Sequence, residues 1–189
     1  MSSVLLSKMR VITGKYKGRS LVAPKHDARP TLDRMKETLF NIVNAKLAGA
    51  DVLDLFAGSG QLAIECLSRG ASRAIVCDNS KDAVAAIKAN FEKIGVMPEL
   101  MFGDFRDCLN RLPCQMDLVF VDPPYKSDFY TEVLQLVDKL DVLKTDGWVV
   151  CEHASEDELP CKVGNLVCFD SRKMGTVKFS FYKGSEICE

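Results

Sequence analysis

From Asp51 onward the chain alternates short apolar runs with amphipathic segments, and this alternation decides its fold class. The expected strands are residues 51–56, 72–78, 98–102, 116–121 and 147–152. The expected helices between them begin near Gly60, Ser80, Phe105 and Ser127. Strands that alternate with helices are joined by right-handed crossovers, so the pattern predicts an α/β fold with a mostly parallel sheet.

Two further regions complete the expected main domain, residues 31–189. Before the first strand, Thr31 or Asp33 can cap a helix that ends at Gly49. After the last of these strands, residues 166–169 and 177–182 are expected to form an antiparallel hairpin at the edge of the sheet. The chain has 189 residues, of which 47% are hydrophobic, and this is enough for one core. We expect no second globular domain.

The first 30 residues form a basic arm. Residues 9–13 and 19–23 flank a turn with two glycines, which predicts a hairpin. Residues 1–29 contain seven Lys or Arg and one Asp, a net charge of +6, whereas the whole chain carries −1. Such an arm suits nucleic-acid phosphates, with an ordinary solvated hairpin as the alternative. The candidate RNA-contacting residues are Arg10, Lys15, Lys17, Arg19, Arg29 and Arg34.

The tetrapeptide Asp122-Pro123-Pro124-Tyr125 directly follows the apolar run at residues 118–121. Two prolines fix φ and lack N–H donors, so the loop is stiff and its carbonyls stay available as acceptors. Asp122 and a proline carbonyl can accept the N–H bonds of a planar amine while Tyr125 stacks on the ring that carries it. The motif predicts a site for a nucleobase amino group, with a simple strand-to-loop turn as the alternative.

A glycine-rich turn after the first strand predicts a cofactor that contains adenosine. Gly58, Gly60 and Ala63 fit the Gly-x-Gly-x-x-Gly/Ala pattern of dinucleotide sites. Asp78 lies 20 residues after Gly58, where an acid accepts the hydroxyls of an adenosine ribose. NAD and S-adenosylmethionine both contain adenosine, so this pattern leaves both open. The candidate cofactor-binding residues are Asp54, Phe56, Ala57, Gly58, Ser59, Gly60, Asp78, Asn79, Asp104 and Phe105.

Charge distinguishes the two cofactors. Asp54 lies at the glycine turn, where a dinucleotide would place its pyrophosphate, and a carboxylate beside phosphates is unfavourable. S-adenosylmethionine instead has positive ammonium and sulfonium groups that Asp54 can attract. Asp104 can accept the adenine amino group and Phe105 can lie against the ring, although Asp104 can also cap the next helix. Ligands of open α/β sheets gather where strands end, so acids at four successive strand ends predict an S-adenosylmethionine site.

The eight cysteines have no Cys-x-x-Cys spacing, and only His26 and His153 could join them at a metal. We therefore expect reduced, mostly buried thiols and no metal. No apolar stretch approaches the roughly 18 residues that span a bilayer, so a cytoplasmic protein without a membrane partner is expected.

The motifs at the strand ends resemble those of a known family. Val52–Gly60, Asp78, Gly103-Asp104 and Asp122–Tyr125 resemble motifs I to IV of class I methyltransferases that modify amino groups. Residues 29–41, Arg-Pro-Thr-Leu-Asp-Arg-Met-Lys-Glu-Thr-Leu-Phe-Asn, resemble the signature of the RsmD family. The resemblance extends over nearly the whole chain and departs little from the family, chiefly in extra residues at the start.

This resemblance implies a Rossmann-like fold with a seven-stranded sheet whose last strand is antiparallel, and S-adenosylmethionine as the cofactor. It implies methyl transfer to N2 of a guanine in 16S rRNA, the guanine-966-type site of the family, within the small ribosomal subunit or its assembly intermediate. The loop Asp122, Pro123, Pro124 and Tyr125 would then be catalytic, with Asp122 and the Pro123 carbonyl accepting the amino N–H bonds. We expect the enzyme to be a monomer.

Three other functions compete with this one. Adenine-N6 methyltransferases that act on DNA or RNA share the Asp-Pro-Pro-Tyr loop, but those that read a DNA sequence usually need an added domain, for which no residues are left. A nicotinamide oxidoreductase is disfavoured by Asp54 and by the lack of an obvious hydride-transfer acid. A non-catalytic rRNA-binding or assembly module would need the basic arm but not an intact set of pocket residues.

Overall fold

The structure, a computed structural model, describes residues 9–24, 33–124 and 129–185. Within these residues one eight-stranded sheet has the strand order β3-β2-β1-β4-β5-β8-β7-β6. The strands are β1 (Asp51–Asp54), β2 (Arg73–Asp78), β3 (Glu99–Phe102), β4 (Met116–Val121), β5 (Leu143–Ala154), β6 (Lys162–Val163), β7 (Leu166–Met174) and β8 (Val177–Gly184). The helices are α1 (Asp33–Val43), α2 (Gln61–Ser68), α3 (Lys81–Ile94), α4 (Phe105–Asn110) and α5 (Phe129–Lys139), with a short 3-10 helix, η1 (Asn44–Lys46).

The strands β3, β2, β1, β4 and β5 run parallel, and β8 lies antiparallel to β5. Antiparallel pairing of β7 and then β6 extends the sheet beyond β8. The predicted α/β, Rossmann-like fold with an antiparallel last strand is confirmed, with eight strands in place of seven. The additional strand, β6, has two residues at the edge of the sheet, too short for a periodic signal in the sequence.

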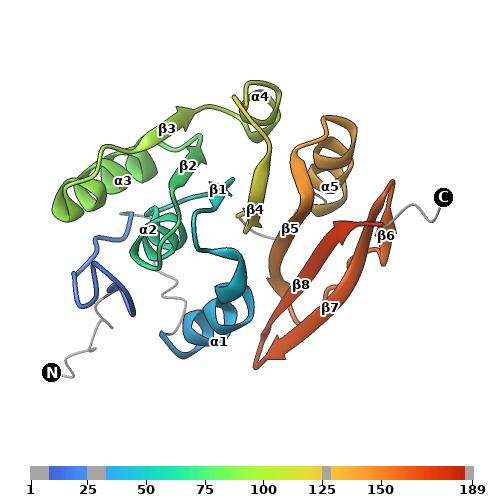
Figure 1. Cartoon of the computed structure of the whole chain (residues 1–189), viewed down its shortest axis with the longest axis horizontal. Coiled ribbons are helices and arrows are strands. Elements are labelled where there is room, and N and C mark those ends of the chain that lie inside the picture. The colour runs from blue at the N-terminus through green and yellow to red at the C-terminus, as the bar shows by residue number, and fades with distance from the viewer. Residues whose placement is uncertain (1–8, 25–32, 125–128, 186–189) are drawn as a thin grey trace, which may run out of the picture.

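Helices cover both faces of the sheet, with α4 and α5 on one face and α1, α2 and α3 on the other (Figure 1). Successive residues of a strand point to opposite faces, so each central strand is apolar on both sides. In β4, Val119 and Val121 lie in the core with α4 and α5, whereas Leu118 and Phe120 lie in the core with α1. This alternation also directs the polar residue that ends each strand to one side.

The predicted starts of the four later helices are confirmed to within two residues. Ser80 caps α3 by accepting the N–H of Ala83, and Asp104 caps α4 by accepting the N–H of Arg106. In the described part of the chain, no helix has the length and apolar content needed to cross a membrane.

Helix α1 ends earlier than the sequence pattern predicts. It stops at Val43, and η1 continues the chain to Leu47, which is fully buried. Lys36 is also fully buried, although the pattern predicts no lysine in the core. Its ammonium donates to the backbone carbonyl of Arg10 at 3.1 Å, and this contact with the arm offsets part of the cost of burial. The predicted capping residue Thr31 lies outside the described residues.

The arm forms a hairpin, as predicted, but with one bridge in place of two strands. Arg10 and Ser20 make this antiparallel bridge, and the Val11 N–H donates to the Arg19 carbonyl at 3.0 Å. The ladder is short because backbone N–H groups near the tip of the hairpin bond to α2 instead of to the opposite segment.

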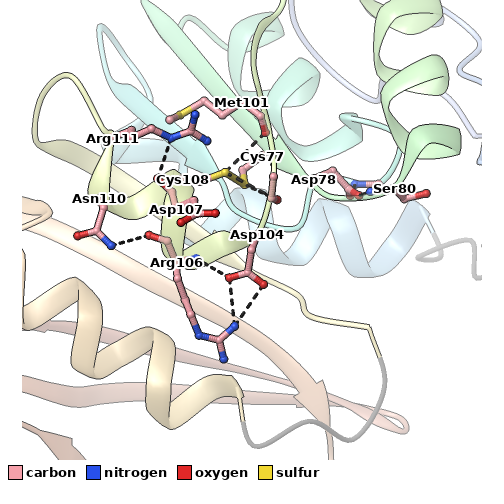
Figure 2. Close-up of a disulfide and its surroundings, with 12 residues drawn as sticks. Cys77, Asp78, Ser80, Met101, Asp104, Arg106, Asp107, Cys108, Asn110 and Arg111 are labelled. Carbon is pink, nitrogen blue, oxygen red and sulfur yellow. Dashed lines mark hydrogen bonds and ion pairs between the residues drawn. A yellow bond between two sulfur atoms is a disulfide. The ribbon is translucent and has the colours of Figure 1, made fainter.

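One pair of cysteines contradicts the expectation of reduced thiols. Cys77, in β2, and Cys108, in α4, form a disulfide (Figure 2). Their Cα atoms lie 6.5 Å apart, within the range that a disulfide can bridge. Both side chains belong to the core beneath α4 and α5, where the fold brings together positions 31 residues apart in the sequence. No Cys-x-x-Cys pattern could indicate a pair at this separation.

Candidate active site

Four acids lie at the carboxyl ends of neighbouring parallel strands and line one cavity of about 740 Å³. Asp54, Asp78 and Asp122 end or follow β1, β2 and β4, and Glu152 lies near the end of β5. Each acid comes two residues after an apolar side chain that packs toward α1, α2 or α3. Because strand side chains alternate, the four carboxyl groups point to the same side of the sheet.

Asp54 is a buried carboxyl group whose Oδ2 atom has no hydrogen-bond partner among the described residues. Burial raises the pKa of Asp54 to about 7, the Ala63 backbone N–H opposes this, and the charges of Asp122 and Asp78 add to it. A carboxyl group in this state gains stability from a ligand that brings a positive charge.

The glycine turn between β1 and α2 holds its backbone close to α3. Gly58 and Gly60 have φ values of 53° and 73°, a left-handed conformation that favours glycine. A Cβ atom on Gly60 would lie 3.0 Å from the ring of Phe91, so a larger residue there would displace the helix packing. Gly60 is the N-cap of α2. The other predicted cofactor residues all line the cavity: Asp54, Phe56, Ala57, Gly58, Ser59, Asp78, Asn79, Asp104 and Phe105.

Asp78 joins the end of β2 to the glycine turn. One oxygen, Oδ2, accepts the backbone N–H of Gly58 at 2.8 Å, and Oδ1 accepts that of Ser80 at 2.8 Å. A carboxylate has about four acceptor positions, so Asp78 can still accept ribose hydroxyls while it holds the turn. Binding of ribose by Asp78 stays a prediction, and the structure supplies the position that it needs.

Asp104 has partners within the protein. Figure 2 shows the Arg106 guanidinium against its carboxylate, at 3.1 Å from Oδ1, and Arg106 also pairs with Glu132 of α5. The predicted capping role of Asp104 is confirmed, whereas its role toward the adenine amino group stays a prediction. Phe105 is buried, and its ring centroid lies 5.5 Å from that of Phe56.

The candidate base-binding half of the cavity is formed by Asp122, Pro123 and Pro124 with the half-buried Phe129. Asp122 and Pro124 are exposed and Pro123 is buried, so the loop presents its carboxylate at the cavity rim. Tyr125 lies outside the described residues, and its stacking role stays a prediction.

Glu152 and Gln61 line the cavity and are absent from the predicted site residues, as are Ser80, Asp82 and Thr176. Glu152 ends the expected strand at 147–152, so the rule that identified the other acids could have found it. Gln61, the first residue of α2, has a buried Oε1 atom with no hydrogen-bond partner among the described residues. No signal in the sequence distinguishes Gln61 from an ordinary polar residue at the start of a helix.

The basic arm is docked on α2 by buried polar groups. Glu65 is 1% exposed and accepts the backbone N–H groups of Ile12 and Thr13 at 2.8 and 3.0 Å. Gly14 has a φ of 87°, and a Cβ atom there would collide with the Ser68 carbonyl group. The arm therefore has a fixed place on the domain.

Docking leaves the predicted RNA-contacting side chains at the surface. Tyr16 is half-buried against the core of α2 and α3, with the Lys15 ammonium 5.2 Å from its ring centroid. Arg29 lies outside the described residues. The exposed cationic residues of the predicted set are Arg10, Lys15, Lys17, Arg19 and, on α1, Arg34.

Two buried oxygens without hydrogen-bond partners among the described residues indicate whether S-adenosylmethionine or a dinucleotide fits the cavity. Asp54 Oδ2 and Gln61 Oε1 are both buried acceptors at one end of the cavity, which suits donors on a cationic ligand. A pyrophosphate has no donor and would bring negative charge against Asp54. These two acceptor oxygens therefore fit the positively charged ammonium and sulfonium groups of S-adenosylmethionine. Among the described residues, no group of His, Cys, Asp and Glu is arranged to hold a metal ion.

The sheet order, the antiparallel last strand and the acids at the strand ends define a class I methyltransferase domain. The chain belongs to the family described as "Conserved hypothetical protein 95", whose sequence profile matches residues 9–183. Together with the relatives below, this match confirms the predicted membership of the RsmD family.

The relatives match over nearly their full length. "Putative rRNA methyltransferase YlbH" of Bacillus subtilis (strain 168) is 38% identical over 181 residues, covering 93% of this chain and 98% of the relative. "Ribosomal RNA small subunit methyltransferase D" of Escherichia coli (strain K12) is 29% identical, covering 93% and 90%. The solved structure of "Putative methyltransferase yhhF from Escherichia coli" superimposes with a TM-score of 0.81 at 28% identity, covering 94% and 98%.

Proposed function

We propose that this protein transfers a methyl group from S-adenosylmethionine to the exocyclic N2 of a guanine in 16S rRNA, at the guanine-966-type site, during assembly of the small subunit. The observation that carries the proposal is the single cavity that joins the cofactor acids to the Asp122-Pro123-Pro124 loop. Relatives named as rRNA methyltransferases support the rRNA substrate, and the RsmD resemblance supports guanine N2. Such a substrate implies work in the cytoplasm, by an enzyme that we expect to be a monomer.

The loop orients a weakly nucleophilic amino group. When bound, S-adenosylmethionine supplies an electrophilic methyl group on its sulfonium sulfur. Asp122 and the Pro123 carbonyl accept the two N–H bonds of the guanine amino group, which directs the nitrogen lone pair out of the plane of the ring. These bonds strengthen as the nitrogen becomes positive, so they stabilise the transition state more than the bound substrate. Transfer would leave the cofactor as its neutral thioether, and the positively charged nitrogen would release one proton to Asp122 or to water.

The base has to leave its neighbours in the RNA to reach this loop. Unstacking costs a few kcal/mol, and stacking on an aromatic ring offsets it. Tyr125 is the proposed stacking residue, and the exposed cations of the arm are proposed to hold the surrounding phosphates.

A nucleoside analysis tests the proposal. Purified protein is incubated with labelled S-adenosylmethionine and, separately, 16S rRNA, small subunits, assembly intermediates and DNA, and each product is digested to nucleosides. We expect N2-methylguanosine from the rRNA-containing substrates. N6-methyladenosine, or its deoxy form, would establish the adenine alternative, and RNA binding without transfer would establish a non-catalytic module.

Variants of the loop separate chemistry from cofactor binding. Asp122→Ala should lower kcat by about 100-fold or more, because it removes an acceptor for the developing positive charge. Asp122→Asn keeps an oxygen acceptor, so its kcat should fall by less. Cofactor affinity, measured by calorimetric titration, should persist in both variants. Wild-type turnover in Asp122→Ala would reduce the tetrapeptide to a structural turn.

A further inference from the structure

Glu152 lies beside Asp122 in the base-binding half of the cavity. Strands β4 and β5 are parallel neighbours, and Val121 is in register with Cys151. Asp122 and Glu152 are the next residues along these two segments. Both residues line the main cavity. Two carboxyl groups therefore face the base, where the sequence predicts one.

The surroundings of Glu152 are largely apolar. Leu39 of α1 and Phe179 of β8 lie around it, with no room left for a water molecule. The Tyr130 hydroxyl donates to the Glu152 backbone carbonyl at 2.6 Å, which holds the strand in place at this residue. Burial, with the Asp122 charge as the lesser cause, raises the pKa of the Glu152 carboxyl group to about 8. A carboxyl group in this position can ionise at low cost once a ligand gives it a hydrogen-bond donor.

Guanine and adenine present different edges beside the amino group. On guanine, the N1–H lies next to the N2 amino group and gives two adjacent hydrogen-bond donors. On adenine, the N1 next to the N6 amino group is an acceptor. Two neighbouring carboxylates match the donor pair of guanine, whereas an ionised carboxylate repels the N1 lone pair of adenine.

We propose that Glu152 is a specificity-determining residue that accepts the N1–H bond of the target guanine while Asp122 accepts an N–H bond of its amino group. This inference rests on the proposed transfer to guanine N2. The bound guanine gives each carboxylate a donor and so relieves their mutual repulsion. The Asp-Pro-Pro-Tyr loop serves adenine and guanine alike, and Glu152 supplies the distinction between them.

The test uses the full-length protein and an RNA substrate that carries guanine or 2-aminopurine at the methylated position. 2-Aminopurine has the same amino group, but its N1 is an acceptor. The wild-type protein should have a kcat/KM about 10- to 100-fold higher for guanine. Glu152→Gln should bring this ratio to within about threefold, because its amide can accept from the guanine N1–H and donate to N1 of 2-aminopurine.

The control separates recognition from a structural role. Glu156→Gln makes the same change at an exposed carboxylate outside the cavity lining and should keep the wild-type ratio. If Glu152 were merely structural, Glu152→Gln would lower kcat/KM for both bases together and leave the ratio unchanged. That outcome would overturn the inference and leave the proposed function intact. A wild-type protein that methylates adenine would overturn both.

A measurement on the wild-type protein keeps the inference testable if Glu152→Gln does not fold. The ratio of kcat/KM for guanine over 2-aminopurine should rise with pH as Glu152 ionises, with its midpoint near pH 8, and level off about one pH unit higher. Among the described residues, the charge that acts on Glu152 is that of Asp122, just after β4, and Tyr130 of α5 is a titratable group beside it. The elements α1, α2 and β8 present Leu39, Leu62 and Phe179. The cofactor acids affect both bases alike and cancel in the ratio. A ratio independent of pH would overturn the inference.

Discussion

Asp54 and Glu152 are carboxyl groups on which burial keeps a proton near neutral pH, with pKa values raised to about 7 and about 8. Asp78 and Asp104 have a different environment, because backbone N–H groups donate to both and the Arg106 guanidinium donates to Asp104. Asp54 and Glu152 therefore lie where a bound ligand, rather than the protein, has to stabilise the ionised carboxylate. Asp54 needs a positive charge, and Glu152 needs a hydrogen-bond donor.

Replacing Asp54 with Asn should remove a pH dependence from the stability of the cofactor-free protein. The folded-state pKa of Asp54, about 7, lies above its ordinary value of 3.8, so between these values the folded protein holds a proton that the unfolded chain releases. The free energy of unfolding should therefore fall as the pH rises through this window, by up to about 4 kcal/mol. Urea unfolding of both proteins between about pH 5 and pH 8 measures the upper part of this window, about 2–3 kcal/mol.

The same proton should appear in cofactor binding. Below pH 7, wild-type affinity for S-adenosylmethionine should rise about tenfold per pH unit, because Asp54 has to ionise before it can attract the cationic groups. Asp54→Asn should remove this contribution from the affinity and should show a smaller fall in stability, because the part that comes from the raised pKa of Glu152 remains. Parallel pH curves for the two proteins would contradict the assignment of the titration to Asp54.

The positions of the strand-end aspartates could be predicted, because each follows an apolar run and the carboxyl ends of parallel strands meet at one edge of the sheet. Their partners could not. Arg106 reaches both Asp104 and Glu132 because α4 packs beside α5, a contact between positions 26 residues apart. Glu152 obeys the same positional rule as the aspartates, and its role becomes visible only when Asp122 is seen beside it.

Among the elements, the arm and α2 are joined through one buried carboxylate. Glu65 accepts two backbone N–H groups of the arm and pairs with Arg69 at 2.8 Å. In the sequence Glu65 is an ordinary acid of an amphipathic helix, because its burial depends on the arm that covers it. The hairpin could be predicted from its turn and its apolar residues, whereas its docking site could not.

Replacing Glu65 with Ala should lower the free energy of unfolding by about 2–4 kcal/mol, because two backbone N–H groups and the Arg69 guanidinium lose their acceptor. Glu65→Gln keeps one oxygen acceptor, so its free energy of unfolding should fall by less. Glu92→Ala, at an exposed position of α3, is the matched control and should change little. Urea unfolding measures the difference, and faster proteolysis within residues 9–24 should accompany it. Equal stability of the two alanine variants would show that Glu65 does not anchor the arm.

The disulfide links β2 to α4 beside two of the predicted cofactor-binding acids, since Asp78 follows Cys77 and Asp104 caps the helix that contains Cys108. Reduction should lower the free energy of unfolding by about 3–4 kcal/mol, because the bridge spans 31 residues of sequence and restricts the unfolded chain. Unfolding with and without a thiol reductant measures the change. Cys108→Ser should not respond to the reductant, and a wild-type protein of equal stability in both conditions would contradict a stabilising bridge.

Across the whole molecule, the order of the parallel strands follows from the alternation of strands and helices, because right-handed crossovers leave few topologies. The place of the arm depends instead on contacts between positions 53 and 68 residues apart, to Glu65 and Asn90. In Figure 1 the arm lies beside α2, far along the sheet from β6 and β7. The described cations of the arm, Arg10, Lys15, Lys17 and Arg19, therefore lie at one end of the sheet, and the residues after the arm are acidic in sum.

This asymmetry predicts how salt acts on RNA binding. Lys15, Lys17 and Arg19 are exposed on the arm, and each contact with a phosphate displaces condensed counterions. Changing all three to Ala should flatten the slope of log K against log salt by roughly two to three units, at about 0.7–0.9 per phosphate. Affinity for 16S rRNA, measured by filter binding over a series of salt concentrations, should fall at every concentration.

A control triple variant removes the same number of charges at the other end of the sheet, at Lys139, Lys162 and Lys173, which are exposed on or beside α5, β6 and β7. It should leave the slope close to that of the wild-type protein. Cofactor affinity and the choice of guanine should stay unchanged in the arm variant, because phosphate contacts position the RNA and base contacts specify it. If the arm serves only to cover α2, its variant will keep the wild-type salt slope and lose stability instead, and the proposed RNA contact will be refuted.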